Sequence, residues 1–412
     1  MDITTAAAAS QMRRVDRAVC RAARTALGRD MRIGVLTGGG DVPGLNVAIK
    51  TVVREAARRG WSVLGLRRGW EALVRFDAAD PASAAWLTTL TPERVRTIDR
   101  TGGTILHTSR LDPHMLPVAD LPPHLAAKAP PGAATFDTTP HVLEAIAALG
   151  LDALIVIGGD GTLRYGARLA AEGVPVVTLP KTMDNDVFGT DMCIGFSTAV
   201  TRSVEAITAL RTTASSHERV LVVELFGRRS GETALLAGLL ADADRTLIAE
   251  VAVDPARLAA LVAADHAANP SRYAVVVVSE GAKLVGGAEI EYGEPDPYGR
   301  RKLGGIGEVL SDEIKARTGL DTIVQRLAYM MRSGPPDSFD RMLATAYATF
   351  AMELVEARAF GQFCAVQAGR YVALPAATPG AGARTVDAAA LYDAEACRPR
   401  LRGIAGRPAF FS

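Results

Sequence analysis

The feature that most constrains the fold is a recurring unit: a short apolar run, a turn rich in glycine or aspartate, and then a helical pattern. The apolar runs lie at 33–37, 153–157, 174–179, 219–225, 247–253 and 274–279. Runs without polar alternation are typical of strands that are covered on both faces of a parallel sheet. The unit therefore predicts an α/β chain, and 412 residues suffice for two or three lobes with their own cores.

Three segments interrupt this pattern. Residues 1–30 contain several arginines but no continuous apolar core, so we expect an N-terminal amphipathic helical arm rather than a secretory signal. The proline-rich stretch from Leu111 to Pro140 predicts a long surface loop. A looser C-terminal tail is expected from Pro379 onward.

Charge and cysteine usage narrow the function classes. The formal net charge is +1 and no basic block stands out, so nucleic acid is not an expected partner. No apolar stretch reaches membrane-spanning length. The four cysteines lack CxxC spacing, which argues against structural zinc and is typical of a reducing compartment. We expect a cytoplasmic protein with neither a nucleic-acid nor a membrane partner.

Two glycine loops follow predicted strands. The loop at 38–44 precedes a helix that Pro43 opens, and the loop at 158–162 follows the strand predicted at 153–157. Backbone N–H groups of such turns can hold a phosphate, although the first loop is by itself also compatible with a simple tight turn. In the second loop, Asp160 is a hard oxygen ligand suited to Mg²⁺ on a donor's phosphates. This GGDGT loop alone does not separate sugar kinases from diacylglycerol or NAD kinases.

A third loop, PKTMDND, carries two further carboxylates after a predicted strand. Asp184 and Asp186 should lie near Asp160, because ligand-binding loops gather at the carboxyl edge of a parallel sheet. Carboxylates so close repel unless cations compensate, and such a cluster serves chemistry more often than folding. We predict that Asp184 is the general base for a sugar hydroxyl, that Lys181 helps to keep it ionised, and that Asp186 orients it or helps to fix the metal.

Together these loops resemble phosphofructokinases, and the resemblance extends over most of residues 31–362. The segments that carry it are 34–46, 180–186, 190–199, 216–228, 279–281, 329–332 and 339–341. The resemblance implies a Mg²⁺-dependent transfer of the ATP γ-phosphoryl group to the 1-hydroxyl of fructose 6-phosphate, which gives fructose 1,6-bisphosphate in glycolysis.

The resemblance also implies an architecture. It predicts two Rossmann-like, three-layer α/β/α lobes with mostly parallel sheets and the active site in the cleft between them. The donor-binding lobe would span 31–195 with about 332–362, and the sugar-phosphate lobe 196–331 with about 363–412. Similar proteins are homodimers or homotetramers, and Arg219 would reach across from a neighbouring subunit.

Site roles follow from the resemblance, position by position. Asp184, Lys181 and Asp186 would be catalytic, and Asp160 would carry Mg²⁺. The donor site would comprise Gly39, Arg110, Gly159, Gly161 and Thr162. Many members carry an arginine where this chain has Thr101, and either Arg100 or Arg110 could substitute for it. The acceptor site would comprise Thr182, Arg219, Phe226, Gly227, Arg228, Glu280, Tyr329 and Arg332.

Two positions bear on the phosphoryl donor and point in opposite directions. Gly161 leaves open the space where pyrophosphate-using members carry a carboxylate that repels a nucleotide α-phosphate. Lys181 favours pyrophosphate, because enzymes with that donor carry lysine there, yet some ATP-using members combine both residues. We give steric exclusion more weight and expect ATP, with pyrophosphate as the alternative.

Departures from the family pattern leave further alternatives open. Ile323 replaces a second inter-subunit arginine and Phe226 stands where methionine is usual, so a related sugar phosphate such as sedoheptulose 7-phosphate is an alternative acceptor. Thr101 and Ile323 also favour a non-catalytic paralogue that binds sugar phosphate, which the three intact aspartates oppose. A lipid or NAD kinase that shares only GGDGT would leave the PKTMDND loop unexplained.

Overall fold

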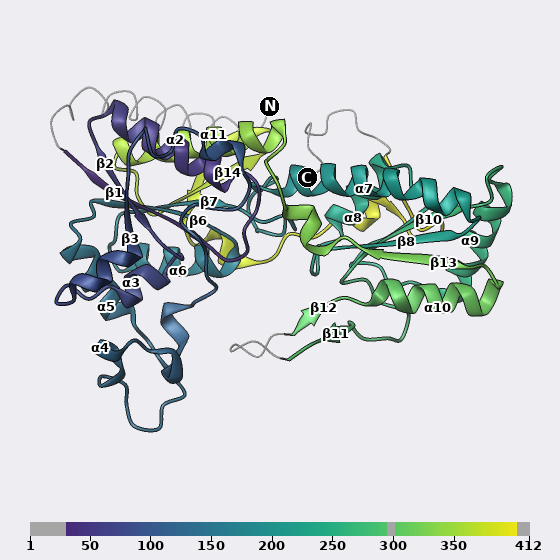
Figure 1. Cartoon of the computed structure of the whole chain (residues 1–412), viewed down its shortest axis with the longest axis horizontal. Helices are drawn as coiled ribbons and strands as arrows, with labels where there is room; N and C mark the ends of the chain where they lie inside the picture. Colours follow the sequence, from purple (N-terminus) through teal and green to yellow (C-terminus); the bar gives the residue numbers. More distant parts are fainter. Residues whose placement is uncertain (1–29, 295–300, 402–412) are drawn as a thin grey trace, which may run out of the picture.

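The structure is a computed structural model that describes residues 30–294 and 301–401. Two lobes, each built on its own β-sheet, lie side by side (Figure 1). The predicted helical arm at 1–30 falls, except for its last residue, outside the described residues. No helix of the described part is both long and apolar enough to cross a membrane.

The first lobe is built on a seven-stranded sheet with the order β15-β14-β7-β6-β1-β2-β3. The inner pairs are parallel, and only the edge strands β3 and β15 run antiparallel to their neighbours. Its elements are β1 (Arg32–Gly38), α2 (Leu45–Arg58), β2 (Ser62–Leu66), α3 (Glu71–Arg75), η1 (Pro81–Trp86), β3 (Leu87–Leu90), η2 (Ile98–Arg100), α5 (Thr139–Ala148), β6 (Ala153–Gly158), α6 (Asp160–Ala171), β7 (Val176–Pro180), α11 (Ser338–Glu356), β14 (Gln362–Gln367) and β15 (Arg370–Pro375).

Helices cover both faces of this sheet, which explains why its inner strands are largely apolar. Ile33 and Ile155 face α2 and α11, whereas Leu36 and Leu154 face α3, α5 and α6. All four side chains are fully buried. Successive strand residues point to opposite faces, so a strand covered on both sides cannot alternate with polar residues.

The second lobe is built on a four-stranded parallel sheet with the order β13-β8-β10-β9. Helices α7 and α8 cover one face and α9 and α10 the other. Its elements are α7 (Phe196–Ser216), β8 (Val220–Leu225), α8 (Glu232–Leu240), β9 (Arg245–Leu247), α9 (Pro255–Ala268), β10 (Ala274–Ser279), β11 (Glu291–Tyr292), β12 (Lys302–Leu303), α10 (Ile306–Thr318), β13 (Thr322–Arg326) and η5 (Ala328–Arg332). The predicted fold class, α/β with mostly parallel sheets, is confirmed.

One predicted strand, at 247–253, is wrong for most of its length. The edge strand β9 ends at Leu247, and the chain then turns away from β10. Ile248 is nevertheless fully buried, because it packs against Val386, Leu391 and Tyr392 of the C-terminal segment. An apolar run can be buried beneath another segment without joining a ladder.

The proline-rich stretch is also more structured than the predicted long loop. It forms η3 (Pro113–Met115), β4 (Leu116–Pro117), η4 (Val118–Asp120), α4 (Pro123–Ala126) and β5 (Thr135–Phe136). These short elements project from the first lobe beside α5 (Figure 1). Leu116 and Leu125 are buried in the core that α3 and α5 share, so the excursion is anchored by apolar contacts.

The C-terminal part divides between the lobes, which corrects the assignment of 363–412 to the second lobe. β14 pairs with β7, and β15 with β14, so these strands extend the sheet of the first lobe. The chain then crosses to the second lobe through η6 (Thr378–Ala381), α12 (Ala388–Leu391), β16 (Tyr392–Asp393) and β17 (Arg398–Pro399). There the Tyr392 hydroxyl donates to the Thr246 carbonyl over 2.7 Å.

Helix α7, which leads from the first lobe into the second, is capped by a residue from distant sequence. Asp340 of α11 is fully buried, and its carboxylate accepts from Gly195 N, Thr198 N and Thr198 Oγ1 over 2.8, 2.8 and 2.5 Å. The first N–H groups of a helix have no partner within it, so a carboxylate there satisfies them and also complements the helix dipole.

We predict that Asp340→Ala lowers the free energy of unfolding by about 3 kcal/mol, because it removes a charged cap and leaves buried donors unpaired. Equilibrium unfolding in urea measures the change. Asp340→Asn keeps one acceptor oxygen and should lose less. Equal stability of Asp340→Ala and the native chain would contradict this role.

Candidate active site

The site begins where two neighbouring strands end at the same level. β6 and β7 are parallel, with Gly158 opposite Pro180. The Lys181 N–H donates to the Gly158 carbonyl over 2.9 Å and extends the ladder by one bond. The GGDGT and PKTMDND loops therefore leave the sheet side by side, as expected for the carboxyl edge of a parallel sheet.

The glycines form a close-fitting cradle around the Lys181 side chain. A Cβ on Gly39, which has φ +83°, would lie 2.9 Å from Lys181 Nζ, and one on Gly159 would lie 3.8 Å from it. Thr162 is buried, and a Cβ on Gly158 would come within 2.3 Å of its Cβ. The glycines thus allow both the close packing of α6 and the approach of the lysine to the loop backbone.

Lys181 is a buried cation among other cations. Only 3% of the residue is exposed, and burial, followed by the charge of Arg332, lowers the pKa of Lys181 to about 8. Arg228 and Arg110 contribute in the same direction, whereas Asp184 opposes them. A phosphate in this cradle would stabilise the protonated lysine by supplying the missing negative charge.

The three aspartates lie close enough to influence one another. Burial, followed by the charge of Asp186, raises the pKa of Asp184 to about 6. The pKa of Asp186 is also raised, chiefly by burial, and the nearby charge of Asp160 adds to the effect. Lys181 does favour the ionised form of Asp184, as expected, but its effect is outweighed, so the carboxyl is a stronger base than a free aspartate.

The second lobe contributes the other side of the site. Arg228 has φ +49°, and its Nε lies 3.7 Å from Asp184 Oδ2. The Arg228 backbone N–H donates to Glu280 Oε1 over 3.0 Å. Burial, followed by the charge of Asp184, raises the pKa of Glu280 to about 7. The ends of β8 and β10 therefore face the PKTMDND loop of the first lobe.

Two side chains of η5, Tyr329 and Arg332, lie beside these loops. Tyr329 packs against Phe226, which follows β8. The rings of Phe226 and Tyr329 meet edge to face with centroids 5.6 Å apart, and the Arg332 guanidinium lies 4.8 Å from the Tyr329 ring. Arg332 Nε also lies 3.6 Å from Asp41 Oδ1, so this predicted acceptor residue reaches the first glycine loop. Tyr329 is 60% exposed and offers its ring to a ligand or a partner.

Not all the predicted site residues come together within one chain. Gly227 adjoins Arg228 at the end of β8, and Thr182 Oγ1 accepts from Asp184 N over 3.1 Å, so both lie in the site. Arg219 precedes the start of β8, at the opposite end of that strand from Phe226. It therefore does not join the other acceptor residues of its own chain.

Asn185 is a site residue that the motif reading missed. It is fully buried with φ +54°, its Nδ2 donates to the Asp191 carbonyl over 2.9 Å, and its Oδ1 accepts from Cys193 N over 2.8 Å. These bonds let its two neighbours, Asp184 and Asp186, project from a fixed backbone. The sequence signal for this role is the residue type, because asparagine adopts a left-handed backbone conformation more readily than most residues.

This chain is similar to known proteins over most of its length. The family model described as phosphofructokinase matches residues 32–355. An ATP-dependent 6-phosphofructokinase of Chloroflexus aggregans is 38% identical over 85% of this chain and 91% of its own. A pyrophosphate–fructose 6-phosphate 1-phosphotransferase of Streptomyces coelicolor is 40% identical over 88% of this chain and 98% of its own.

The chain belongs to the phosphofructokinase family. It is accordingly a phosphotransferase that acts on a sugar hydroxyl. Among solved structures, phosphofructokinase from Saccharomyces cerevisiae superposes with a TM-score of 0.68 at 27% identity, over 85% of this chain. This chain spans 45% of the yeast chain.

In this member of the family, a Mg²⁺ ion would have one protein ligand of its own, Asp160. Its side chain is 57% exposed at the start of α6, with Arg164 Nη1 3.7 Å away. Among the described residues, no group of three or more His, Cys, Asp or Glu side chains could hold a metal. The arrangement still fits Mg²⁺, which commonly takes one or two carboxylates and fills its octahedron with water and substrate phosphates.

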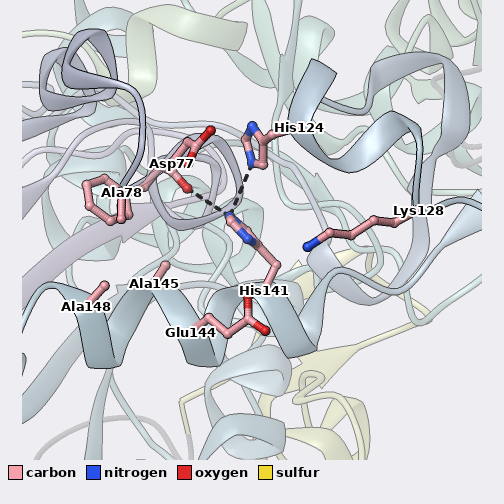
Figure 2. A pocket seen from close by; sticks show the side chains of 9 residues that line it. Asp77, Ala78, His124, Lys128, His141, Glu144, Ala145 and Ala148 are labelled. Atoms are coloured by element: carbon pink, nitrogen blue, oxygen red, sulfur yellow. Dashed lines mark hydrogen bonds between the residues drawn. The ribbon is translucent and has the colours of Figure 1, made fainter.

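A separate hollow of about 330 Å³ lies between α4, α5 and the end of α3 (Figure 2). His124 and His141 lie next to each other in its lining and are joined by a hydrogen bond, with 3.3 Å between their Nε2 atoms (Figure 2). His141 Nε2 donates to the Phe76 carbonyl over 2.8 Å. Glu144 and Asp77 share the lining with Lys128, so the hollow lacks the surplus of cations that a phosphate site needs.

The shifted pKa values of this phosphofructokinase predict a bell-shaped dependence of kcat/KM on pH. Activity should rise as pH increases through about 6, where Asp184 loses its proton, and fall through about 8, where Lys181 loses its charge. Steady-state rates from pH 5 to 9 measure both limbs.

Matched variants separate the groups. Lys181→Arg keeps a charge at every pH in this range and should flatten the alkaline limb. Glu280→Gln removes a carboxyl whose pKa is about 7 and should leave the limb of Asp184 in place. An alkaline limb that persists in Lys181→Arg would show that another group controls it.

Proposed function

We propose that this member of the family is an ATP-dependent 6-phosphofructokinase that phosphorylates the 1-hydroxyl of fructose 6-phosphate. The observation that carries the proposal is the position of Asp184, a carboxylate only 9% exposed, between a cation of each lobe. The ionised form of the Asp184 carboxyl is favoured by Lys181 of the first lobe and by Arg228 of the second lobe. This is the arrangement expected of a base placed between a donor and an acceptor.

Each lobe then has one task. The glycine loops of the first lobe, with Lys181, hold the phosphates of the donor. The second lobe and η5 hold the sugar phosphate through Arg228, Glu280 and the edge-to-face pair Phe226 and Tyr329. Arg332 lies close to Asp41 of the first glycine loop and to Lys181 of the PKTMDND loop. It suits either a phosphate of the acceptor or the group in transfer, because a guanidinium fork matches phosphate oxygens.

The reaction needs one proton transfer and one displacement. Asp184 accepts the proton of the sugar hydroxyl as its oxygen attacks the terminal phosphorus of the donor, and the bond from that phosphorus to the leaving phosphate oxygen breaks. Lys181 and Arg332 favour the charge that develops on the moving group, and the buried site strengthens their effect. When bound at Asp160, Mg²⁺ supplies further neutralisation of donor phosphate charge.

The donor assignment rests on Gly161. A Cβ at this position would meet no atom within 4 Å, so the space beside the metal aspartate is open and can admit the remainder of a nucleotide. Pyrophosphate remains the second candidate, and Lys181 favours it because its ammonium group already fills the centre of the glycine cradle. Relatives with either donor match this chain to similar extents.

The assembly that we propose is a homodimer or homotetramer in the cytoplasm. Arg219 lies at the far end of β8 from the acceptor residues, which supports a role at the acceptor site of another subunit. Cys193, Cys364 and Cys397 are all buried and unpaired, which suits a reducing compartment.

We predict that Asp184→Asn lowers kcat by about a hundredfold or more, because an amide of the same shape cannot accept the proton. A coupled assay with ATP and fructose 6-phosphate measures the rate, and an unchanged melting temperature shows that the fold is intact. Near-native turnover in this variant would remove Asp184 from its role as the base.

We predict that Gly161→Asp abolishes most activity with ATP while pyrophosphate activity survives or rises. The open space at this position lets the side chain enter without disturbing α6, and the added carboxylate repels the α-phosphate. Rates with the two donors, each with fructose 6-phosphate and then sedoheptulose 7-phosphate, also decide the acceptor. Unchanged kinetics with ATP would contradict the donor assignment.

A further inference from the structure

The C-terminal segment passes directly against the PKTMDND loop after leaving β15. Val187 forms an antiparallel bridge with Ala383. The backbone N–H of Arg384 donates to the Asp186 carbonyl over 3.0 Å. The segment then continues along the second lobe beside α8 (Figure 1, yellow). A part of the chain about two hundred residues away thus completes the backbone bonding of the catalytic loop.

The side chain of Arg384 adds a second attachment to the same loop. Its Nη1 donates to the Asn185 carbonyl over 3.2 Å. The same guanidinium forms an ion pair with the buried carboxylate of Glu232, the first residue of α8. The next residue of that helix, Thr233, donates its hydroxyl to the Met183 carbonyl over 3.2 Å.

These bonds hold the loop from outside, and Asn185 holds it from inside. The carbonyls of residues 183, 185 and 186 are bonded to the second lobe and the C-terminal segment, whereas the Asn185 side chain is bonded to residues 191 and 193. The backbone between the two carboxylates therefore has little freedom to rotate. A small rotation there would move the Asp184 carboxylate away from the hydroxyl that it must reach.

We propose that Arg384 is a positioning residue for phosphoryl transfer, which fixes the backbone of residues 183–186 so that the Asp184 carboxylate points at the acceptor hydroxyl. The inference rests on the proposed role of Asp184 as the base. Arg384 lies beyond residues 32–355, which the phosphofructokinase family model matches, so neither that match nor any motif assigns it a role. The planar guanidinium suits the task because it bonds Glu232 and a carbonyl at the same time, which a lysine ammonium would do with less defined geometry.

The test compares Arg384→Met with Arg398→Met. Arg398 lies in the same C-terminal segment and pairs with Asp265 over 3.3 Å, but it bonds to no residue of the catalytic loop. We expect Arg384→Met to lower kcat by about tenfold to a hundredfold, with the KM for fructose 6-phosphate within about threefold of native. Arg384→Lys should retain an intermediate kcat, and Arg398→Met should retain native kinetics.

Amide hydrogen exchange supplies a measurement that does not depend on turnover. Residues 181–187 should exchange faster in Arg384→Met, and partly in Arg384→Lys, but at the native rate in Arg398→Met. If the native protein turns over fructose 6-phosphate with neither donor, the proposed function fails while the exchange data still test the contact. A native kcat in Arg384→Met, an equal loss in Arg398→Met, or native exchange of the loop would each overturn the positioning role.

Discussion

The parallel pairing of β6 with β7 is the interaction on which the site depends. Because Gly158 lies opposite Pro180, both strands end at one level, and the bond from Lys181 N to the Gly158 carbonyl keeps the two loops together beyond the sheet. A shift of this register by one residue would turn the side chains at the strand ends to the other face of the sheet. The glycine loop and the aspartates of the PKTMDND loop would then no longer adjoin.

The fold must also bring together buried groups of opposite charge at this site. Asp184, Glu280 and Lys181 are each less than a tenth exposed, and burying an uncompensated charge is costly. The carboxylates come from both lobes, and so do the cations that compensate them. Each lobe therefore carries part of a charge distribution in which buried carboxylates and cations compensate one another, and the net effect on Asp184 is a pKa raised to about 6.

Much of the fold and site followed from local patterns. The runs at 33–37, 153–157 and 274–279 are strands, since an apolar run covered on both faces has few alternatives. The glycine and aspartate loops adjoin because each follows such a strand. The run at 247–253 failed as a strand because its burial comes from a segment more than a hundred residues later, which no local pattern encodes.

The same limit explains what was missed in the site. Arg384 lies in a segment without a motif, and its position beside the PKTMDND loop follows from the path of the chain across both lobes. The net rise in the pKa of Asp184 was not foreseen either, because spacing from Lys181 reveals the attractive charge but not the depth of burial. Distances along the sequence describe neighbours within a loop, whereas desolvation depends on everything packed around it.

The core described for the first lobe does not stop at its boundary. The apolar residues beneath α2 and α11 continue through α7 to those beneath α8, so both sheets border one packed interior. A flexible connector that would let the lobes swing apart as rigid halves is therefore lacking along this path in the described residues. Closure around substrates would have to proceed by shear, in which packed helices slide over one another by small amounts and retain their contacts.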